Sequence, residues 1–347
     1  MNVRMGIVAF TAAAAALVTL QDARAVALAY SVNEIFNLRV SPGIGGNLTF
    51  AQGSPAFESF DRANLASVQG EMSNTDNTGP TFDALLACEG DCGRLVNNDF
   101  REHLPHLAQG DAVIDNTGVL AGTFRARNDA LVHLDRPDRG SAGASNTVTA
   151  DFALAMADAI TFTFDARPAL NALLSRDLMG STGAELRFVI RIRDGGGALV
   201  FEWAPNGMVD RMITGGTEMT DDTSLNLVRG ADRPGDSSKF NPAGVLEGML
   251  DDADCAVVPP APIGTCNYAA VTNNLAMGSY RLTIAMTELA STSDIRARVP
   301  EPNGLGLFVL GLMGLVLGRI PRGRHGSVHP RCPSKNENLR CRHNPVA

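Results

Sequence analysis

Residues 185–203 read Glu-Leu-Arg-Phe-Val-Ile-Arg-Ile-Arg-Asp-Gly-Gly-Gly-Ala-Leu-Val-Phe-Glu-Trp, and this stretch decides the fold class. Even-numbered positions from Leu186 to Ile192 are apolar, while arginine fills three of the odd-numbered positions between 187 and 193. This period of two is typical of a half-buried strand. Three glycines at 195–197 then favour a tight turn into a second apolar run. The stretch predicts a β-hairpin.

The same period recurs on both sides of the hairpin. Residues 152–156, 160–164 and 280–287 alternate apolar and polar side chains, and 122–136 suggests a second hairpin that turns at Asn128-Asp129. Regular strands with few long helices between them favour antiparallel sheets. We therefore expect a mainly β protein, an antiparallel β-sandwich of jelly-roll type.

A few short helices complete the expected fold. Asp165-Ala166-Arg167-Pro168 resembles a helix start, which predicts a helix to about Leu178. Asn241-Pro242 predicts another to about Leu250. The body, residues 26–298, is long enough for one domain, in which we expect 26–110 to be looser and 111–298 to form the sandwich core.

Composition and charge exclude two classes of protein. The chain is 45% hydrophobic and only 19% charged, whereas a disordered chain needs low hydrophobicity and high charge. Residues 26–318 hold 20 Lys and Arg against 35 Asp and Glu, a formal net charge of −15. Such an acidic surface repels phosphate backbones, so we expect no nucleic-acid partner.

The first 25 residues have the three parts of a secretory signal. Arg4 precedes an uncharged run from Met5 to Leu20, and Ala23-Arg24-Ala25 supplies small residues at a cleavage position. This pattern predicts a signal helix over 1–25, which signal peptidase removes after Ala25. The body is then exported.

The C-terminal region also has three parts in order. Val299-Pro300-Glu301-Pro302 precedes an apolar, Gly-rich segment, 304–318, and arginines follow at Arg319, Arg322 and Arg324. The uncharged stretch 302–318 would be about 25 Å long as a helix, the lower limit for crossing a bilayer. We expect a transmembrane helix over 304–318 with its arginines in the cytoplasm, and a disordered tail over 325–347.

This order of motifs resembles the PEP-CTERM sorting signal of exported proteins in Gram-negative bacteria. The resemblance covers only about residues 299–324. It implies an exosortase-like processing enzyme as partner, transient attachment to the inner membrane, and final delivery to the cell surface or the extracellular, polysaccharide-rich matrix of a biofilm. Such tails usually stop soon after the arginines, whereas this chain continues to Ala347.

The body holds four cysteines, Cys88, Cys92, Cys255 and Cys266. Exported cysteines meet an oxidising compartment, so disulfides are expected. Three connectivities are possible, and the local one, Cys88–Cys92 with Cys255–Cys266, is the simplest. The spacing of Cys88 and Cys92 to His103 and His106 also fits a Cys2His2 zinc site, although Pro105 disrupts the helix that normally presents such histidines.

One loop has the oxygen-ligand alternation of a calcium site. Asn74, Asp76 and Thr78 are followed by a glycine, as in an EF-hand-like loop. Leu85 stands at the twelfth position, where a bidentate glutamate belongs. Calcium is thus a weak candidate ligand, and we expect no other cofactor.

Catalytic motifs are poor. Gly235-Asp236-Ser237 is similar to the nucleophile tripeptide of some esterases, but no histidine occurs between His133 and His325. We therefore expect a non-catalytic, exported cell-surface or matrix protein. The alternative is a carbohydrate-binding module, calcium-dependent or not, that uses Trp203 or Tyr280. A hydrolase of matrix polysaccharide is the third hypothesis.

Overall fold

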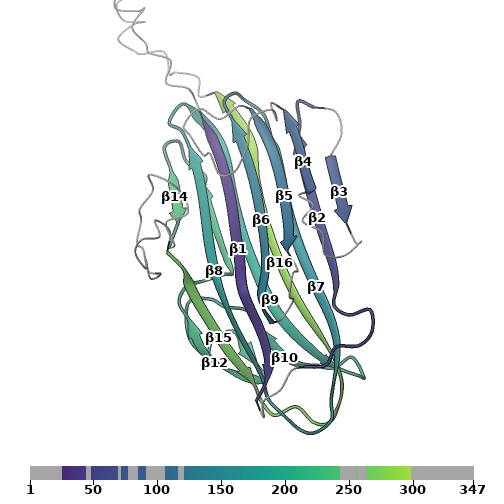
Figure 1. Ribbon diagram of the computed structural model, residues 1–347. Coiled ribbons are helices and arrows are strands. Elements are labelled where there is room, and N and C mark those ends of the chain that lie inside the picture. Colours follow the sequence, from purple (N-terminus) through teal and green to yellow (C-terminus); the bar gives the residue numbers. More distant parts are fainter. Residues whose placement is uncertain are drawn as a thin grey trace, which may run out of the picture. The chain divides into compact units, whose positions relative to one another are not determined.

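Strands make up all the regular structure in the part of the chain that the computed structural model describes: residues 26–43, 48–68, 72–76, 85–90, 106–115, 121–242, 255 and 264–297. All of these residues belong to a unit that spans Met1–Arg298. The strands form two antiparallel sheets that pack face to face (Figure 1). The expected mainly β, antiparallel class is confirmed.

The first sheet, here called the β1 sheet, has the order β12 (Gly216–Asp221), β15 (Cys266–Thr272), β8 (Ile160–Leu174), β1 (Ala27–Pro42), β6 (Ala121–Leu134), β5 (Leu107–Asp115) and β4 (Leu85–Gly90), with β14 (Ser237–Phe240) also paired to β8. The second, the β16 sheet, has the order β11 (Ile213–Thr214), β10 (Leu199–Trp203), β9 (Leu178–Asp194), β16 (Gly278–Ala297), β7 (Gly140–Leu154), β2 (Ala56–Leu65) and β3 (Met72–Asp76), with β13 (Leu227–Ala231) paired to β9.

The hairpin predicted at 185–203 is present as β9 and β10. Asp194 closes the turn, because its N–H donates to the Ala198 carbonyl (2.9 Å) and its carbonyl accepts from Gly197 N (2.8 Å). Gly197 has φ +86°, a conformation that favours glycine. The predicted strands at 152–156, 160–164 and 280–287 lie, at least in part, in β7, β8 and β16.

The predicted helix at 165–178 is wrong, since residues 160–174 form β8. The strand pairing explains why Pro168 is tolerated in β8. β15 pairs with β8 as far as Ala166, and β14 pairs with it from Leu170 on. Pro168 lies where the pairing passes from one strand to the other, so its missing N–H removes no ladder bond on that side. No helix occurs in the described residues, and the helix expected after Asn241 extends into residues outside them.

The second predicted hairpin is also wrong, because β6 continues through Asn128-Asp129 as one strand. Asn128 is fully buried, and its side-chain N–H₂ donates across the sandwich to the Met286 carbonyl (3.1 Å). Asp129 points to the other face, where it pairs with Arg127 (2.7 Å). Two polar residues that are typical of turns therefore serve a long strand instead.

β1 lies in the middle of its sheet, between β6 and β8, although we expected 26–110 to be looser (Figure 1). The following strands, β2 to β5, extend one edge of both sheets. The inward positions of β1 include Ala27 and Ala29, which are fully buried. Alanine alternation is a weak strand signal, so the sequence analysis missed this central strand.

The core changes character along the strands. One half is aromatic, with stacked pairs such as Phe164–Tyr268 (4.7 Å between ring centroids) and Phe162–Phe201 (5.3 Å). The other half is mostly alanine with a few Leu, Ile and Val side chains. Small side chains let the sheets approach closely. At Gly110 in β5 an added Cβ would overlap the Gly143 carbonyl oxygen of the opposite sheet.

A buried polar layer lies between the sheets. The Asn146 side-chain amide donates to Asn128 Oδ1 (2.5 Å), and Asn146 Oδ1 accepts from Ser59 Oγ (2.6 Å). Asp61 and Glu288 are fully buried in the β16 sheet, and their carboxylate oxygens have no hydrogen-bond partner among the described residues. Burial, with Asp111 nearby, raises the pKa of Asp61 to about 8. Burial also raises the pKa of Glu288 well above its usual value. The Asp61 carboxyl is therefore mainly protonated at neutral pH.

We predict that Gly110→Ala destabilises the fold by about 2–3 kcal/mol, because the added methyl must push two strands apart. Its Cβ would overlap the Gly143 carbonyl and lie 2.7 Å from the Arg62 carbonyl oxygen. The control is Gly230→Ala, whose Cβ would meet nothing closer than the Thr182 carbonyl oxygen at 3.4 Å. Urea unfolding followed by Trp203 fluorescence measures both. Equal stability of the two variants would contradict the close approach.

A second prediction concerns pH. The pKa of Asp61 is about 8 in the folded state against 3.8 in a free side chain. The folded state therefore binds the proton more tightly, and this group's contribution to stability falls as pH rises from about 4 to about 8. Asp61→Asn removes this loss of stability, so the free energy of unfolding at pH 8 should be about 1–2 kcal/mol higher in the variant than in the parent.

The matched control is Asp232→Asn, at an exposed residue directly after β13. Thermal unfolding from pH 5 to pH 8 should show a flatter stability profile for Asp61→Asn and an unchanged one for Asp232→Asn. Some slope should remain in Asp61→Asn, because burial and Asp129 raise the pKa of Asp111 to about 6. Parallel profiles for the parent and Asp61→Asn would refute the protonated state.

Candidate functional site

A cavity of about 630 Å³ lies at one end of the β16 sheet. We call it the end pocket. Three strand ends meet there: the end of β7 at 151–153, the end of β9 with its turn at 193–197, and the start of β16 at 279–281. Segment 49–51 forms the fourth side, because Ala51 N donates to the Asp151 carbonyl (2.8 Å) and Phe50 forms a bridge with Phe152.

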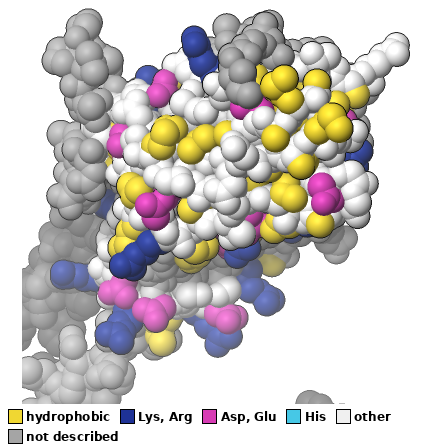
Figure 2. Space-filling view, turned by 90° about the horizontal axis from the view of Figure 1, so that it is seen from below, with side chains coloured by type: hydrophobic (Ala, Val, Ile, Leu, Met, Phe, Trp, Pro, Cys, Tyr) yellow, Lys and Arg dark blue, Asp and Glu magenta, His cyan; other side chains and the backbone are white. Residues whose placement is uncertain are grey.

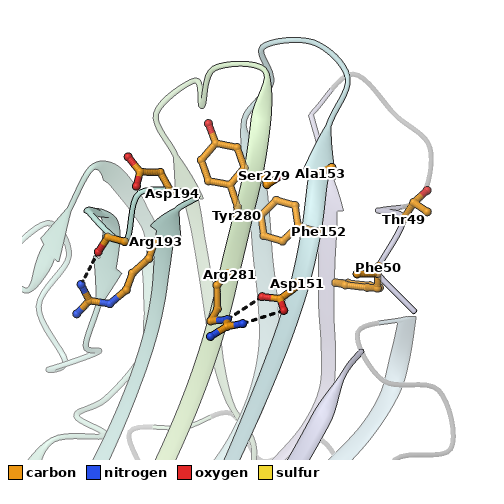
Figure 3. A pocket seen from close by; sticks show the side chains of 13 residues that line it. Thr49, Phe50, Asp151, Phe152, Ala153, Arg193, Asp194, Ser279, Tyr280 and Arg281 are labelled. Carbon is orange, nitrogen blue, oxygen red and sulfur yellow. Dashed lines mark hydrogen bonds and ion pairs between the residues drawn. The ribbon is translucent and has the colours of Figure 1, made fainter. Parts of the chain in front are cut away.

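Aromatic rings form the inner part of the pocket. Phe152 and Tyr280 stack with ring centroids 5.5 Å apart, and both are at least nine-tenths buried. The Tyr280 hydroxyl donates to the Ala276 carbonyl (2.7 Å), which fixes the ring. Figure 3 shows Phe50 on the far side of Phe152 from Tyr280. Both stacked rings belong to the aromatic half of the core and support the inner side of the pocket.

Charged side chains lie in a row on the outer face of the sheet. The strand register places Arg193 of β9, Arg281 of β16 and Asp151 of β7 side by side. Arg281 donates twice to Asp151, from Nε (2.7 Å) and from Nη2 (3.0 Å), as Figure 3 shows. These hydrogen bonds from Arg281 lower the pKa of Asp151, so the carboxylate is ionised at neutral pH.

The second carboxylate of the pocket is structural. Asp194 Oδ1 accepts hydrogen bonds from the N–H groups of Gly196 and Ala198 (2.9 Å each), which closes the hairpin turn. A glycosidase acid needs a raised pKa and a free position beside the substrate. Both pocket carboxylates instead accept hydrogen bonds from groups of the protein itself, so neither is free beside a ligand.

The same end of the sandwich exposes several methionines. Met156 and Met277 are 60% and 72% exposed, and the bridge between Asp158 and Leu275 sets them opposite each other. Figure 2 shows hydrophobic side chains among acids and arginines over this end of the molecule. The end pocket therefore opens onto a surface that is apolar as well as charged.

A second hollow, of about 420 Å³, lies over β1, β8, β12 and β15. Asn37, at a β-bulge with φ +57°, donates to Asp165 Oδ2 (2.6 Å) at its edge. Arg39, Asn267 and two threonines complete a polar lining. It has two-thirds of the volume of the end pocket, and the Asn267 side chain donates to Asp222 (3.0 Å).

No family model, curated protein or solved structure matches this chain. The function is therefore argued from the site alone.

Of the two aromatic residues proposed for sugar binding, one is excluded and one lies in the pocket. Trp203 is fully buried, and its indole N–H donates to Glu218. Burial raises the pKa of Glu218 above its usual value, although the hydrogen bond from Trp203 acts in the opposite direction. Trp203 thus holds the edge strand β12 through Glu218, and its buried ring is not available to a ligand. Tyr280 lines the end pocket.

The zinc hypothesis fails at His106. Its Nδ1 lies 3.1 Å from Asp135 and its Nε2 lies 2.8 Å from Asp138, so both ring nitrogens are occupied. Burial raises the pKa of Asp138, but hydrogen bonds from Ser67 and His106 outweigh it and lower that pKa. Cys88 is disulfide-bonded, which removes a thiolate ligand. Cys92 and His103 lie outside the described residues.

The calcium candidates do not form a described loop. Asn74 and Asp76 belong to β3, where they pair with Asp61 and Ser59, and Thr78 lies outside the described residues. Within the ranges that the structure describes, no group of three or more His, Cys, Asp or Glu side chains is placed to hold a metal ion.

One predicted disulfide is confirmed: Cys255 is bonded to Cys266 at the start of β15, with Cα atoms 4.8 Å apart. Both cysteines are buried in the aromatic half of the core. The predicted partner of Cys88 is Cys92, which is not described, so that pairing stays a prediction.

The esterase-like tripeptide has a structural role. Asp236 N donates to the Arg233 carbonyl (2.9 Å) in a turn, and Ser237 begins β14. The strand register sets Ser237 opposite Leu173, Leu173 opposite Leu28, and Leu28 opposite His133. Three strand spacings separate Ser237 from His133, about 14 Å. A Ser–His pair of these two residues is excluded.

The sequence analysis missed Arg193, Arg281 and Asp151 as pocket residues. It did identify alternation in parts of all three strands, and that alternation places Arg193 and Arg281 on the solvent face. The missing information was the strand register, because only the order β9, β16, β7 brings three distant segments into one row.

Proposed function

We propose that this chain is an exported, non-catalytic protein of the cell surface or extracellular matrix, sorted through its C-terminal segment. The observation that carries the proposal is the combination of export patterns at both ends with a sandwich that contains a buried Cys255–Cys266 disulfide. Disulfides form and persist mainly in oxidising compartments. The proposed location is therefore outside the cytoplasm of a Gram-negative cell.

The proposed route uses both ends of the chain. Signal peptidase removes a signal helix at 1–25, segment 304–318 crosses the inner membrane transiently, and an exosortase-like enzyme acts near Pro300-Glu301-Pro302. All of these residues lie outside the described ranges. Within those ranges, no helix is long and apolar enough to cross a membrane.

The strand order supports a jelly roll in which the first strand of the chain, β1, occupies the position of the last jelly-roll strand. β1 pairs with β6 and β8, β8 pairs with β15, β16 pairs with β7 and β9, and β9 pairs with β10. Two four-stranded sheets with successive strands crossing between them are typical of a jelly roll. In our proposal β1 takes the place of the strand that would follow β16, and β2 to β5 are an insertion along one edge.

A second candidate function is carbohydrate binding at the end pocket. The observation that favours it is a cavity of about 630 Å³ whose lining includes arginine, aspartate and hydroxyl groups. Pockets of this size and mixed lining are typical of small-ligand sites. Because both pocket carboxylates are held as acceptors, we place polysaccharide hydrolysis behind binding.

The sorting proposal predicts that tail arginines hold the precursor for processing. Replacing Arg319, Arg322 and Arg324 with alanine removes charges that cost about 2.5–3.5 kcal/mol each at mid-bilayer, so unprocessed chain should pass through the membrane. Pulse-chase immunoblotting of membrane and medium fractions, in a Gram-negative host with an exosortase, measures this. Alanine at Arg331, Arg340 and Arg342, beyond the segment, is the matched control and should be processed like the parent.

A variant with Pro300, Glu301 and Pro302 changed to alanine should remain untrimmed in the membrane. If this variant and the Arg319, Arg322 and Arg324 variant were both trimmed and located like the parent, the sorting proposal would be wrong.

The binding proposal predicts that the full-length chain is retained on immobilised matrix polysaccharide. Ala153→Trp would fill the end pocket and should reduce retention about tenfold or more. Ala198→Trp, at an exposed turn residue not among the pocket lining, should leave it unchanged. Chelator in a parallel column tests calcium dependence. Equal retention of both variants would place any binding elsewhere.

A further inference from the structure

We propose that Arg193 makes the end pocket selective for an acidic saccharide, one whose sugar ring carries a carboxylate. This inference rests on the proposed carbohydrate-binding function and adds the class of ligand. It is drawn from the charges of the β16 sheet, where β9 and β16 carry five arginines, at positions 187, 191, 193, 281 and 296.

Four of these five arginines already have a carboxylate partner. Arg187 pairs with Glu185, Arg191 with Glu202 (2.6 Å), Arg281 with Asp151 (2.7 Å) and Arg296 with Asp294 (4.0 Å). Arg193 differs, because its one contact within the described residues is from Nη1 to the Gly197 carbonyl (3.0 Å). A guanidinium has five N–H donors, so most donors of Arg193 are available to a ligand.

The register adds a second argument. Arg193 lies directly opposite Arg281 on the neighbouring strand, and like charges at such positions repel each other. Asp151 neutralises only one of the two, so the row of Arg193, Arg281 and Asp151 carries a net charge of +1. An anion bound at Arg193 would complete the neutralisation.

The other acid of the pocket does not compete for Arg193. Asp194 follows Arg193 in the strand, and consecutive side chains point to opposite faces. Figure 3 shows the Asp194 carboxylate and the Arg193 guanidinium pointing away from each other. Asp194 is also engaged by two N–H groups of its own turn. The positive row therefore faces the cavity without a second carboxylate against it.

The chemistry of the remaining lining fits a sugar. The planar fork of arginine matches a carboxylate with two parallel hydrogen bonds. Ser279 and Thr49 add hydroxyl groups, and Ser279 lies on the same face of β16 as Arg281. The Gly197 carbonyl holds the Arg193 side chain in place before any ligand arrives, which reduces the entropy lost on binding.

Asp151 acts in this scheme as an internal competitor. It occupies Arg281 with two hydrogen bonds, and Arg281 would otherwise be a second cation for the ligand. Asp151→Asn should release Arg281 and tighten the binding of an anionic sugar. Arg193→Gln should weaken it. The two variants change the charge of the pocket in opposite directions.

The test is equilibrium dialysis of the full-length chain in detergent against oligogalacturonate and against a neutral galactose oligomer of equal length. We expect the acidic oligomer to bind at least about tenfold more tightly, as a charge-assisted bidentate contact implies. Arg193→Gln should abolish this preference, and Asp151→Asn should increase it. Arg187→Gln, on the same strand and face but outside the pocket, should leave it unchanged.

The outcomes separate the two proposals. Equal binding of the acidic and neutral oligomers would overturn the role of Arg193 and keep carbohydrate binding. Binding of neither oligomer would overturn both. Inorganic phosphate that displaces the acidic oligomer at equal concentration would show a site for charge alone, and would overturn the saccharide assignment. Emission of the buried Trp203, unchanged in each variant, verifies folding.

Discussion

The structure depends on two central strands that come from opposite ends of the body. β1 begins at Ala27 and β16 ends at Ala297, yet each lies in the middle of its sheet. Neither sheet is continuous without its central strand, so the core cannot close until nearly the whole body is present. Contacts between residues so far apart in sequence make folding slow, because loop closure precedes the gain from pairing.

The sheets stay in register through polar as well as apolar contacts. Asn128 reaches across to the Met286 carbonyl, and Ser31 reaches across to the Glu185 carbonyl (2.8 Å). A shift of one residue in any of these strands would place the amide or hydroxyl on the solvent face. The close approach at Gly110 acts in the same way, since a neighbouring residue there would bring a Cβ into the opposite backbone. The polar layer and the glycine thus select one alignment of the sandwich.

The end pocket follows from this alignment. Three long strands stop at one level, and the turn after Asp194 and segment 49–51 form its sides. The row of Arg193, Arg281 and Asp151 exists because β16 lies between β9 and β7. A binding site placed at the ends of rigid strands is held more firmly than one on loops alone. The same strands keep their aromatic residues in the core, which explains why Trp203 is unavailable to a ligand.

The sequence by itself determined the fold class, the 185–203 hairpin and the Cys255–Cys266 bridge, because period-two alternation, a glycine turn and two nearby cysteines are local signals. It misassigned residues 165–178 and 122–136, since Pro168 and Asn128-Asp129 are local signals that tertiary pairing overrides. Pro168 lies between the parts of β8 that pair with β15 and with β14, so no described strand pairs with it on that side. The Asn128 side chain is buried because it donates a hydrogen bond to the opposite sheet. The pocket residues could not be predicted, because Arg193, Arg281 and Asp151 are distant in sequence and carry no shared motif. Only strand order and register, which depend on burying both sheet faces in one core, decided that they meet.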